Sequence, residues 1–466
     1  FRKYDANKIS LELEPGENLL VVKLSNYGTA EARFLFEILE EENSDLQGDV
    51  AAALATPPEK RTDAQREALR RKYRRDHWPQ WRAVFRELAL VRGEEKALLD
   101  QVPTTLVFKE RAQPRESFLL KRGEYDRKGE KIGRGVPAAL PPLPQDRPPD
   151  RLALAKWLLD PRHPLTARVA VNRFWQQVFG TGIVKTSEDF GLQGEPPSHP
   201  ELLDALAARF IADGWDVKKL MRTLVLSSTY RQSSRVTPEL ARRDPDNRLL
   251  ARGPRFRMDA EMVRDQILFL SGLLVERVGG PSVKPPQPEG LWEAVGYTGS
   301  NTYRFQRDPE PGKVFRRSLY IFWKRTSSPP MMSLFDAPSR ESCVARRERT
   351  NTPMQALMLM NEPQCFEAAR HLAQKAIREG GAGPEERAAW LIRRCVLRTP
   401  TDKDVADLAE LYRAQREIFA RAPEEARKTV SFGDVPPDPS VDPVELAAWT
   451  MVANAVLNLD EVVTKR

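Results

Sequence analysis

From residue 150 onward the chain consists of short amphipathic segments separated by capping residues, prolines and glycines. Asp150 can cap a helix that ends at Asp160-Pro161, and a second helix is predicted from Thr166 to Phe179, stopping at Gly180. Short helices gain most of their stability by burying an apolar face against a neighbour. The pattern therefore predicts a mainly α, multi-helix domain over residues 150–466.

Further start and stop signals extend this pattern. Ser198-His199-Pro200-Glu201 matches a capping box and would place His199 at the first helical position. Asp259 begins a long helix that Gly279-Gly280-Pro281 should end. Thr352-Pro353-Met354-Gln355 joins a capping box to a helix-starting proline, and the helix containing Cys365 should end at Gly380-Gly381. More helices are predicted at residues 215–227, 384–397, 402–420 and 444–463.

One small β-insertion is predicted inside the helical domain, near residues 295–325. Residues 303–306 and 318–323 have strand-like composition and would pair as a hairpin. The turn between them would be Asp308-Pro309-Glu310-Pro311-Gly312.

Three regions precede the helical domain. Residues 1–40 alternate as short strands and fit the C-terminal end of a β-sandwich. Residues 41–100 are predicted to form a helical hairpin, with a capping box at Thr62-Asp63-Ala64-Gln65. Residues 101–149 return to extended structure and a proline-rich linker. The chain begins at Phe1 without an initiator methionine, so we expect a piece of a longer protein.

Composition argues against several classes of protein. The 466 residues carry a formal net charge of +8 with basic and acidic residues intermixed, whereas nucleic-acid binders concentrate basic residues on one face. We therefore expect no nucleic-acid partner. The longest apolar stretch, residues 267–275, is too short to span a bilayer. The three cysteines, Cys343, Cys365 and Cys395, form no disulfide framework, and we expect them to be buried, apolar residues.

Long ordered blocks of the chain resemble a bacterial family known chiefly from planctomycetes. One block, residues 151–234, begins RLALAKWLLDPRHPLTARVAVNRFWQQVFG, and another, residues 316–363, includes SPPMMSLFDAPSRESC and TPMQALMLMNEP. Residues 103–142, the TPTDKDV turn at 399–405 and AAWTMVANAVLNLDEVVTKR complete the likeness. The family is domain of unknown function fifteen fifty-three, the planctomycete cytochrome-associated domain.

This resemblance implies an exported, extracytoplasmic protein. It implies a c-type haem domain upstream and often a β-sandwich resembling carbohydrate-binding modules, which residues 1–40 would end. The haem-attachment pattern C-x-x-C-H is absent from this sequence, so we expect no cofactor in this chain. The resemblance supplies no catalytic residues.

A loop rich in arginine is the first candidate site. Asp336, Arg340, Glu341 and Cys343 are followed closely by Arg346, Arg347, Glu348 and Arg349. Alternating acids and guanidiniums make bidentate pairs that fix a loop, or they grip a carboxylate or sulfate on a ligand. A nucleophilic Cys343 would need a nearby base, and no histidine is close in sequence.

The second candidate combines two histidines with polar residues in the first helices. It comprises His163, Asn172, Arg173, Asp189 and His199. A buried Arg173 would require a carboxylate partner, for which we expect Asp189. A neutral His199 at a helix start is a candidate base or metal ligand, and local loop bonding is the alternative. With four histidines in the chain, a metal site of several histidines is not expected.

The third candidate is an aromatic cluster around the predicted hairpin. Its rings are interleaved with cations, an arrangement that suits stacking on acidic sugars and equally suits packing in a half-buried hairpin. The predicted ligand-binding residues are Trp292, Tyr303, Tyr320, Trp323, Arg325, Arg340 and Arg346.

These observations lead to one expected function and two alternatives. We expect an accessory or binding module of an exported, haem-linked protein that handles polysaccharide, with an anionic glycan and the upstream haem domain as partners. The first alternative is a hydrolase or haem-coupled oxidoreductase that uses His199, Asp189 and Asp336. The second is a structural component of a cell-surface assembly.

Overall fold

The computed structural model of the protein describes residues 44–465. The chain divides into two compact units, Phe1–Pro114 and Arg115–Arg466. The sandwich strands predicted within residues 1–40 lie outside the described residues.

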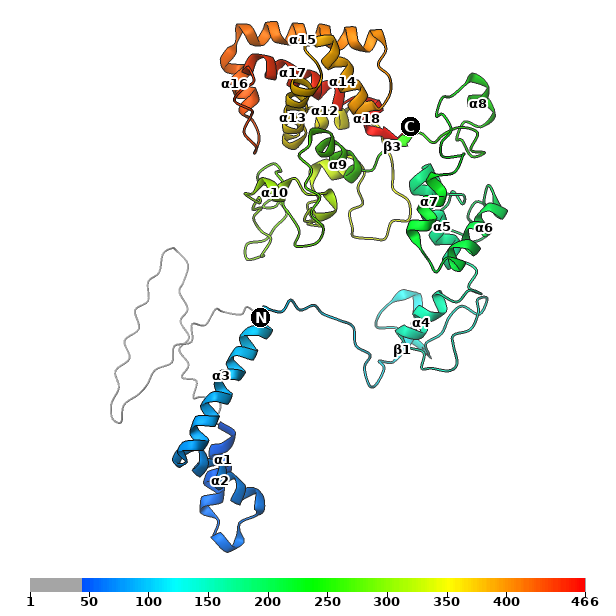
Figure 1. Ribbon diagram of the computed structural model, residues 1–466. Helices are drawn as coiled ribbons and strands as arrows, with labels where there is room; N and C mark the ends of the chain where they lie inside the picture. The colour runs from blue at the N-terminus through cyan, green and yellow to red at the C-terminus, as the bar shows by residue number, and fades with distance from the viewer. Residues whose placement is uncertain (1–43, 466) are drawn as a thin grey trace. The chain divides into compact units, whose positions relative to one another are not determined.

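The described part of the first unit is helical (Figure 1). It contains α1 (Ser44–Ala55), the 3₁₀ turn η1 (Pro58–Lys60), α2 (Asp63–His77) and α3 (Pro79–Gln101). The predicted capping box at Thr62 is confirmed, because Gln65 N–H donates to Thr62 Oγ1 at 3.3 Å and Thr62 N–H donates to Gln65 Oε1 at 2.9 Å. Pro79 then occupies the first position of α3.

The second unit confirms the mainly α class with a small β-hairpin. The hairpin pairs β1 (Ser117–Leu120) with β2 (Lys128–Ile132) in antiparallel fashion. The 3₁₀ turn η2 (Lys121–Gly123) joins the strands, with Arg122 in the left-handed region at φ 55°. The β1–β2 hairpin therefore forms within residues 101–149, for which the sequence predicted only extended structure and a linker.

The hairpin predicted around residue 310 is wrong. Among the described residues 295–325 no strand forms, and Pro311 instead begins the short helix α10 (Pro311–Val314). The backbone near the 3₁₀ turn η3 (Ser318–Tyr320) pairs with an earlier segment: Val283 N–H donates to Tyr320 O and Phe322 N–H donates to Val283 O, both at 2.8 Å. A partner distant in sequence thus takes the hydrogen bonds that a hairpin would need.

A smaller core follows the proline-rich linker. Its helices are α4 (Arg151–Leu158), α5 (Thr166–Phe179), α6 (Pro200–Ala212), α7 (Val217–Val225) and α8 (Pro238–Arg243). The bounds of α5 match the prediction, and Gly180 closes the helix at φ 83°. Buried apolar side chains from α5, α6 and α7 form this core, among them Val171, Trp175, Phe179, Leu203, Leu206, Phe210, Leu220 and Leu224.

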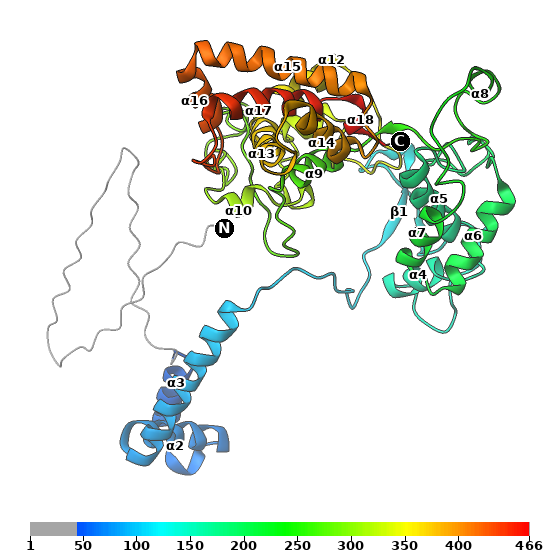
Figure 2. The same ribbon diagram turned by 45° about the horizontal axis from the view of Figure 1, so that its top comes forward.

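A larger core occupies the remainder of the second unit. Its helices are α9 (Ala260–Ser271), α11 (Pro330–Leu334), α12 (Pro353–Asn361), α13 (Pro363–Glu379), α14 (Pro384–Val396), α15 (Asp402–Arg421), α16 (Pro423–Ser431), α17 (Pro443–Leu457) and α18 (Asp460–Val463). Helix α17 packs against α13, α14, α15 and α16, and both ribbon views show α15 lying along it (Figures 1 and 2). Trp449 of α17 is fully buried and stacks on Tyr412 of α15 at 4.4 Å.

The C-terminal end of α13 agrees with the prediction, whereas that of α9 does not. Helix α13 ends at Gly380, as predicted. Helix α9 stops at Gly272, in the left-handed conformation at φ 81°, and not at Gly279. The chain therefore leaves the helix at Gly272, seven positions before the predicted stop at Gly279.

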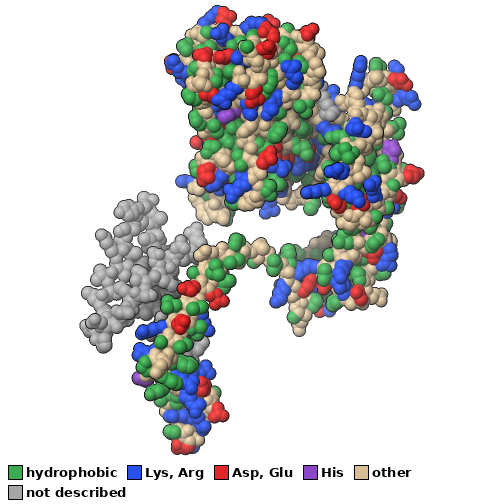
Figure 3. Space-filling view, in the orientation of Figure 1, with side chains coloured by type: hydrophobic (Ala, Val, Ile, Leu, Met, Phe, Trp, Pro, Cys, Tyr) green, Lys and Arg blue, Asp and Glu red, His purple; other side chains and the backbone are tan. Residues whose placement is uncertain are grey.

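The C-terminal strand closes the larger core. Strand β4 (Thr464–Lys465) pairs in antiparallel fashion with β3 (Phe256–Arg257), just before α9. Lys465 Nζ also lies over the rings of Tyr230 and Phe256, at 4.2 and 5.7 Å. On the visible face of α15 and α16, basic and acidic side chains are intermixed (Figure 3).

Candidate ligand-binding site

The three predicted catalytic residues lie in separate local networks. Asp189 Oδ1 accepts from Gly191 N–H at 2.6 Å, as in a tight turn. His199 Nδ1 lies 3.0 Å from Ser198 Oγ, and Asp336 accepts from Thr350 N–H at 2.7 Å. Within residues 44–465 no hydrogen bond or ion pair connects Asp189, His199 and Asp336 with one another. The structure therefore does not bring them together as a bonded constellation.

Two details of the first helices differ from the prediction. Arg173 is exposed and the adjacent Asn172 is fully buried, so the expected buried pair between Arg173 and Asp189 is wrong. Asn172 Oδ1 accepts from Val184 N–H at 2.8 Å and fixes the loop after α5. His199 is the N-cap residue of α6 without a side-chain cap bond, so neither the capping box nor a first-turn His199 forms.

The His163 side chain forms its hydrogen bonds within its own loop. Its Nδ1 accepts from the backbone N–H groups of Leu165 and Thr166, at 3.3 and 3.2 Å, and its buried ring meets Trp157 edge-on at 4.5 Å. These contacts fix the turn between α4 and α5. No group of three or more histidine, cysteine, aspartate or glutamate side chains in the described part of the chain is arranged to hold a metal ion.

The arginines of the 336–349 loop bind mainly to the protein itself. Arg347 makes two hydrogen bonds to Glu261, at 2.6 and 3.1 Å. Burial opposes ionisation of Glu261, but the bonds from Arg347 outweigh it and hold the pKa of Glu261 below its ordinary value. Arg346 pairs with Glu188 at 3.3 Å, and Arg349 donates to Gly180 O at 3.0 Å. The loop therefore links α9 to the smaller core.

The aromatic cluster is partly an interior feature. Trp292 is 2% exposed and packs against Phe305 and Phe322, so it is removed from the predicted sugar-facing surface. Tyr303 is half-buried, and the Tyr320 hydroxyl accepts from Gly279 N–H at 2.8 Å. Tyr320 and Trp323 are half-buried as well, and Arg325, Arg340 and Arg346 are exposed.

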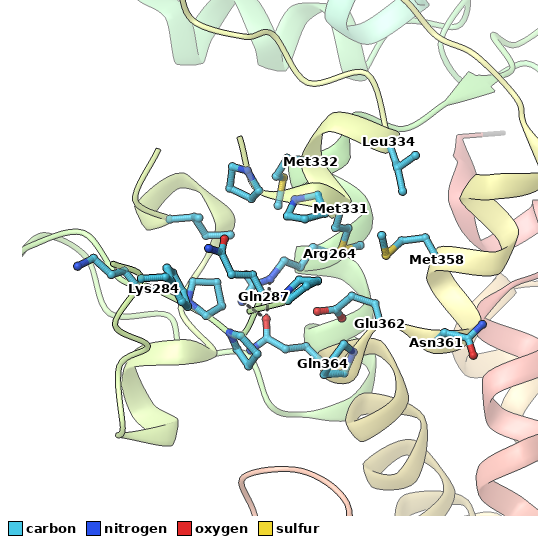
Figure 4. Close-up of a pocket in the computed structure, with 18 of the residues that line it drawn as sticks. Arg264, Lys284, Gln287, Met331, Met332, Leu334, Met358, Asn361, Glu362 and Gln364 are labelled. Carbon is cyan, nitrogen blue, oxygen red and sulfur yellow. Dashed lines mark hydrogen bonds between the residues drawn. The ribbon is translucent and has the colours of Figure 1, made fainter. Parts of the chain in front are cut away.

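A mainly apolar cavity lies elsewhere, between α9, α11, α12 and the start of α13 (Figure 4). Its volume is about 310 Å³, a size that suits a small organic molecule. Most of its wall is proline, methionine and phenylalanine, including Pro285, Pro286, Pro288, Phe305, Phe322, Pro329, Pro330, Met331, Met332, Met354, Met358 and Pro363. Methionine side chains are flexible and polarisable, so such a wall adapts to apolar ligands of different shape.

A buried arginine forms the polar floor of this pocket. Arg264 of α9 uses all five N–H donors: Nε and Nη2 bond Gln364 Oε1 at 3.0 and 2.7 Å, and Nη2 also bonds Val314 O at 2.7 Å. Nη1 bonds Arg316 O at 2.9 Å and Ser318 Oγ at 3.2 Å. Arg264 thereby ties α9 to α13 and to the irregular segment around α10.

Glu362, the N-cap residue of α13, lies beside Arg264 in the pocket (Figure 4). Its Oε2 accepts from Cys365 N–H at 2.8 Å. Burial raises the pKa of Glu362, although the bond from Cys365 and the charge of Arg264 oppose this shift. A perturbed carboxyl in an apolar pocket is a common feature of binding and catalytic sites.

The buried Glu362 gives a prediction for stability against pH. Because its folded-state pKa lies above the ordinary 4.5, its stabilising contribution is complete below pH 4.5 and is lost as the pH rises through the raised pKa. We expect Glu362→Gln to gain stability relative to the wild type as the pH rises from 4.5 to about 8. Urea unfolding at both pH values measures this difference.

Glu341→Gln is the matched control, because Glu341 is an exposed carboxylate of the 336–349 loop. It makes the same change of charge at the surface and so separates the effect of losing a charge from the effect of burial. A Glu362→Gln difference that stays constant between the two pH values would contradict a raised pKa at Glu362.

Sequence reasoning missed this pocket. The residues that form it, such as those in SPPMMSLF and TPMQALMLMNEPQ, contributed to the family resemblance but were not interpreted as a cavity wall. The available signal was the density of methionine and proline in segments without a long apolar face. Among the described helices, none combines the length and the apolar character needed to cross a membrane.

Comparison with known proteins supports the resemblance. None of the curated proteins and none of the solved structures matches the chain. A family model described as PSD1, protein of unknown function (DUF1553), matches residues 150–412, from α4 into α15, and includes the whole pocket. Because this match spans more than half of the 466 residues, the chain belongs to the PSD1 family of proteins of unknown function (DUF1553).

Proposed function

We propose that this chain is a binding module whose ligand is a small, largely apolar molecule held in the pocket between α9, α11, α12 and α13. The observation that carries the proposal is the combination of a mainly apolar, 310 Å³ cavity with a few polar groups on its floor. Cavities lined by apolar side chains bind small apolar molecules readily.

A binding role fits the pocket better than catalysis by the neighbouring Cys365, whose backbone N–H bonds the pocket residue Glu362. Burial raises the pKa of Cys365 well above the ordinary 9.0, and the neighbouring charge of Glu362 adds to this effect. The thiolate is the nucleophilic form of cysteine, so Cys365 is a poor nucleophile at neutral pH.

Filling the pocket tests the proposal. Met358→Trp places a larger side chain in the wall, and we expect it to weaken binding of propylbenzene roughly tenfold or more by removing the space. Ligand-observed nuclear magnetic resonance titration measures the affinity. Met360→Trp is the matched control, because Met360 is on the same helix but does not line this pocket.

Wild-type protein that fails to bind propylbenzene would contradict the proposal. The same conclusion would follow if Met358→Trp and Met360→Trp weakened binding equally, because the effect would then not depend on the pocket.

A second candidate function is contact with an anionic glycan, within an exported, haem-linked protein that handles polysaccharide. It is favoured by Arg340, an exposed residue whose guanidinium lies 4.2 Å from the centre of the Trp323 ring. We expect binding on a glycan array to be lost in Arg340→Ala, which removes the exposed charge, and retained in Arg346→Ala, which removes an arginine already paired with Glu188. Equal binding by both variants would contradict this candidate.

A further inference from the structure

The polar groups of the pocket determine which polar group of a ligand can bind there. The Arg264 guanidinium is charged, but each of its N–H groups already donates to a protein oxygen. A carboxylate ligand would therefore find no unused guanidinium donor at the floor. Lys284, the other cation of the wall, directs its ammonium away from Arg264 and Glu362 (Figure 4), toward the rings of Trp292 and Phe322 at 5.6 and 5.3 Å.

Glu362 supplies acceptor capacity at the same floor. Its carboxylate has about four lone-pair sites, of which the backbone N–H of Cys365 uses one at 2.8 Å. The Gln364 backbone and the Cys365 thiol also interact with it. The remaining acceptor capacity favours a ligand that donates a hydrogen bond. An ammonium ligand would bring a second positive charge next to Arg264, so the favoured donor is uncharged.

Gln287 supplies the complementary group. Its side-chain Nε2 is buried, and no acceptor in the described part of the chain, residues 44–465, bonds to it. A buried amide donor without a partner destabilises the folded state. A ligand that accepts from Gln287 would remove this cost. Gln287 lines the same pocket as Glu362.

We propose that the ligand is an uncharged molecule with an apolar body and a carboxamide-type group. The N–H of this group donates to the Glu362 carboxylate, and its carbonyl accepts from Gln287 Nε2. The inference rests on the proposed function of the pocket and adds the chemical class of the ligand. The apolar body would lie against the methionine and proline wall, and the amide would face the floor.

A matched series of probes tests this class: phenylpropionamide, phenylpropionate, phenylpropylamine and propylbenzene. They share the aromatic body and differ in the terminal group. With the whole chain, we expect the amide to bind roughly tenfold more tightly than each of the other three. Ligand-observed titration at constant pH and salt gives the four dissociation constants.

Glu362→Gln should remove the preference for the amide over the carboxylate. The glutamine can keep one oxygen on the Cys365 N–H and would then present its NH₂ group where the carboxylate accepted. The pocket would offer donors from both Gln287 and residue 362, and one negative charge would be lost. We expect the ratio of amide to carboxylate affinity to fall roughly tenfold or more.

Gln287→Leu is the second variant, since it lies in a partly exposed loop segment and leaves the α13 cap intact. It should reduce amide binding severalfold while leaving propylbenzene unchanged. If propylbenzene binds but the amide is not preferred, and neither variant changes the order, the amide class is wrong and the apolar pocket stands. If no probe binds, the pocket function and the amide class both fail.

Discussion

Replacing Arg264 with methionine should lower the free energy of unfolding of the second unit by about 3–5 kcal/mol. Methionine keeps much of the side-chain volume but removes all five hydrogen bonds that Arg264 makes. The buried carbonyl of Arg316 would lose its partner, and Gln364 Oε1 would lose both of its guanidinium donors. The Val314 carbonyl would keep only the bond from Gln364 Nε2, at 3.0 Å. Glu362 would also lose the cation that balances its charge.

Arg346→Met is the matched control for this experiment. Arg346 is exposed and its ion pair with Glu188 lies at the surface, where such pairs contribute about 0–1 kcal/mol. Urea unfolding followed by tryptophan fluorescence compares the two variants with the wild type. Similar unfolding midpoints for Arg264→Met and Arg346→Met would show that Arg264 does not hold the segment around α10 in place.

One of the three cysteines should react with a thiol reagent in the folded protein, and two should not. Cys343 is exposed, whereas Cys365 and Cys395 are buried. Burial raises the pKa of Cys395 from 9.0 to about 12, so its thiolate fraction at neutral pH is roughly a thousandfold smaller. We therefore expect about one equivalent of rapid colour release from an aromatic disulfide reagent, and the rest only after unfolding in urea.

Cys343→Ser provides the control for thiol reactivity, because it should abolish the rapid phase and leave the slow one. A second rapid equivalent in the native protein would contradict the burial of Cys365 or Cys395. The structure also corrects the expectation from sequence that all three cysteines are buried apolar residues, because Cys343 is exposed.

The sequence predicted those features that depend on neighbouring residues. Thr62 and Gln65 form their capping box, α5 ends at Gly180, and α13 ends at Gly380, because each signal acts within one helical turn. The mainly α class follows from the sum of such signals. The local signal at Ser198–Glu201 is an exception, because His199 and not Ser198 becomes the N-cap residue of α6.

Features that depend on distant segments were not predictable in the same way. The strand-like segment 318–323 bonds to Val283, not to residues 303–306. The sequence pattern predicted that Asn172 and Arg173 both interrupt the buried face of α5. Adjacent residues on a helix point about 100° apart, so Asn172 is buried and Arg173 is exposed. The pocket combines Arg264 of α9 with several later segments between residues 284 and 364, so no single window of sequence contains it.

The position of α17 has a consequence for how the protein is made on the ribosome. This helix contributes Leu446, Trp449, Val452 and Val456 to the larger core, yet it is translated after α13, α14, α15 and α16, against which it packs. The buried residues of the smaller core lie within residues 171–224, with Tyr230 and Leu250 packed against them, so this core can close early in synthesis. The apolar faces of α13 and α15 that α17 covers remain exposed to solvent until α17 leaves the exit tunnel. During this interval chaperone binding competes with aggregation.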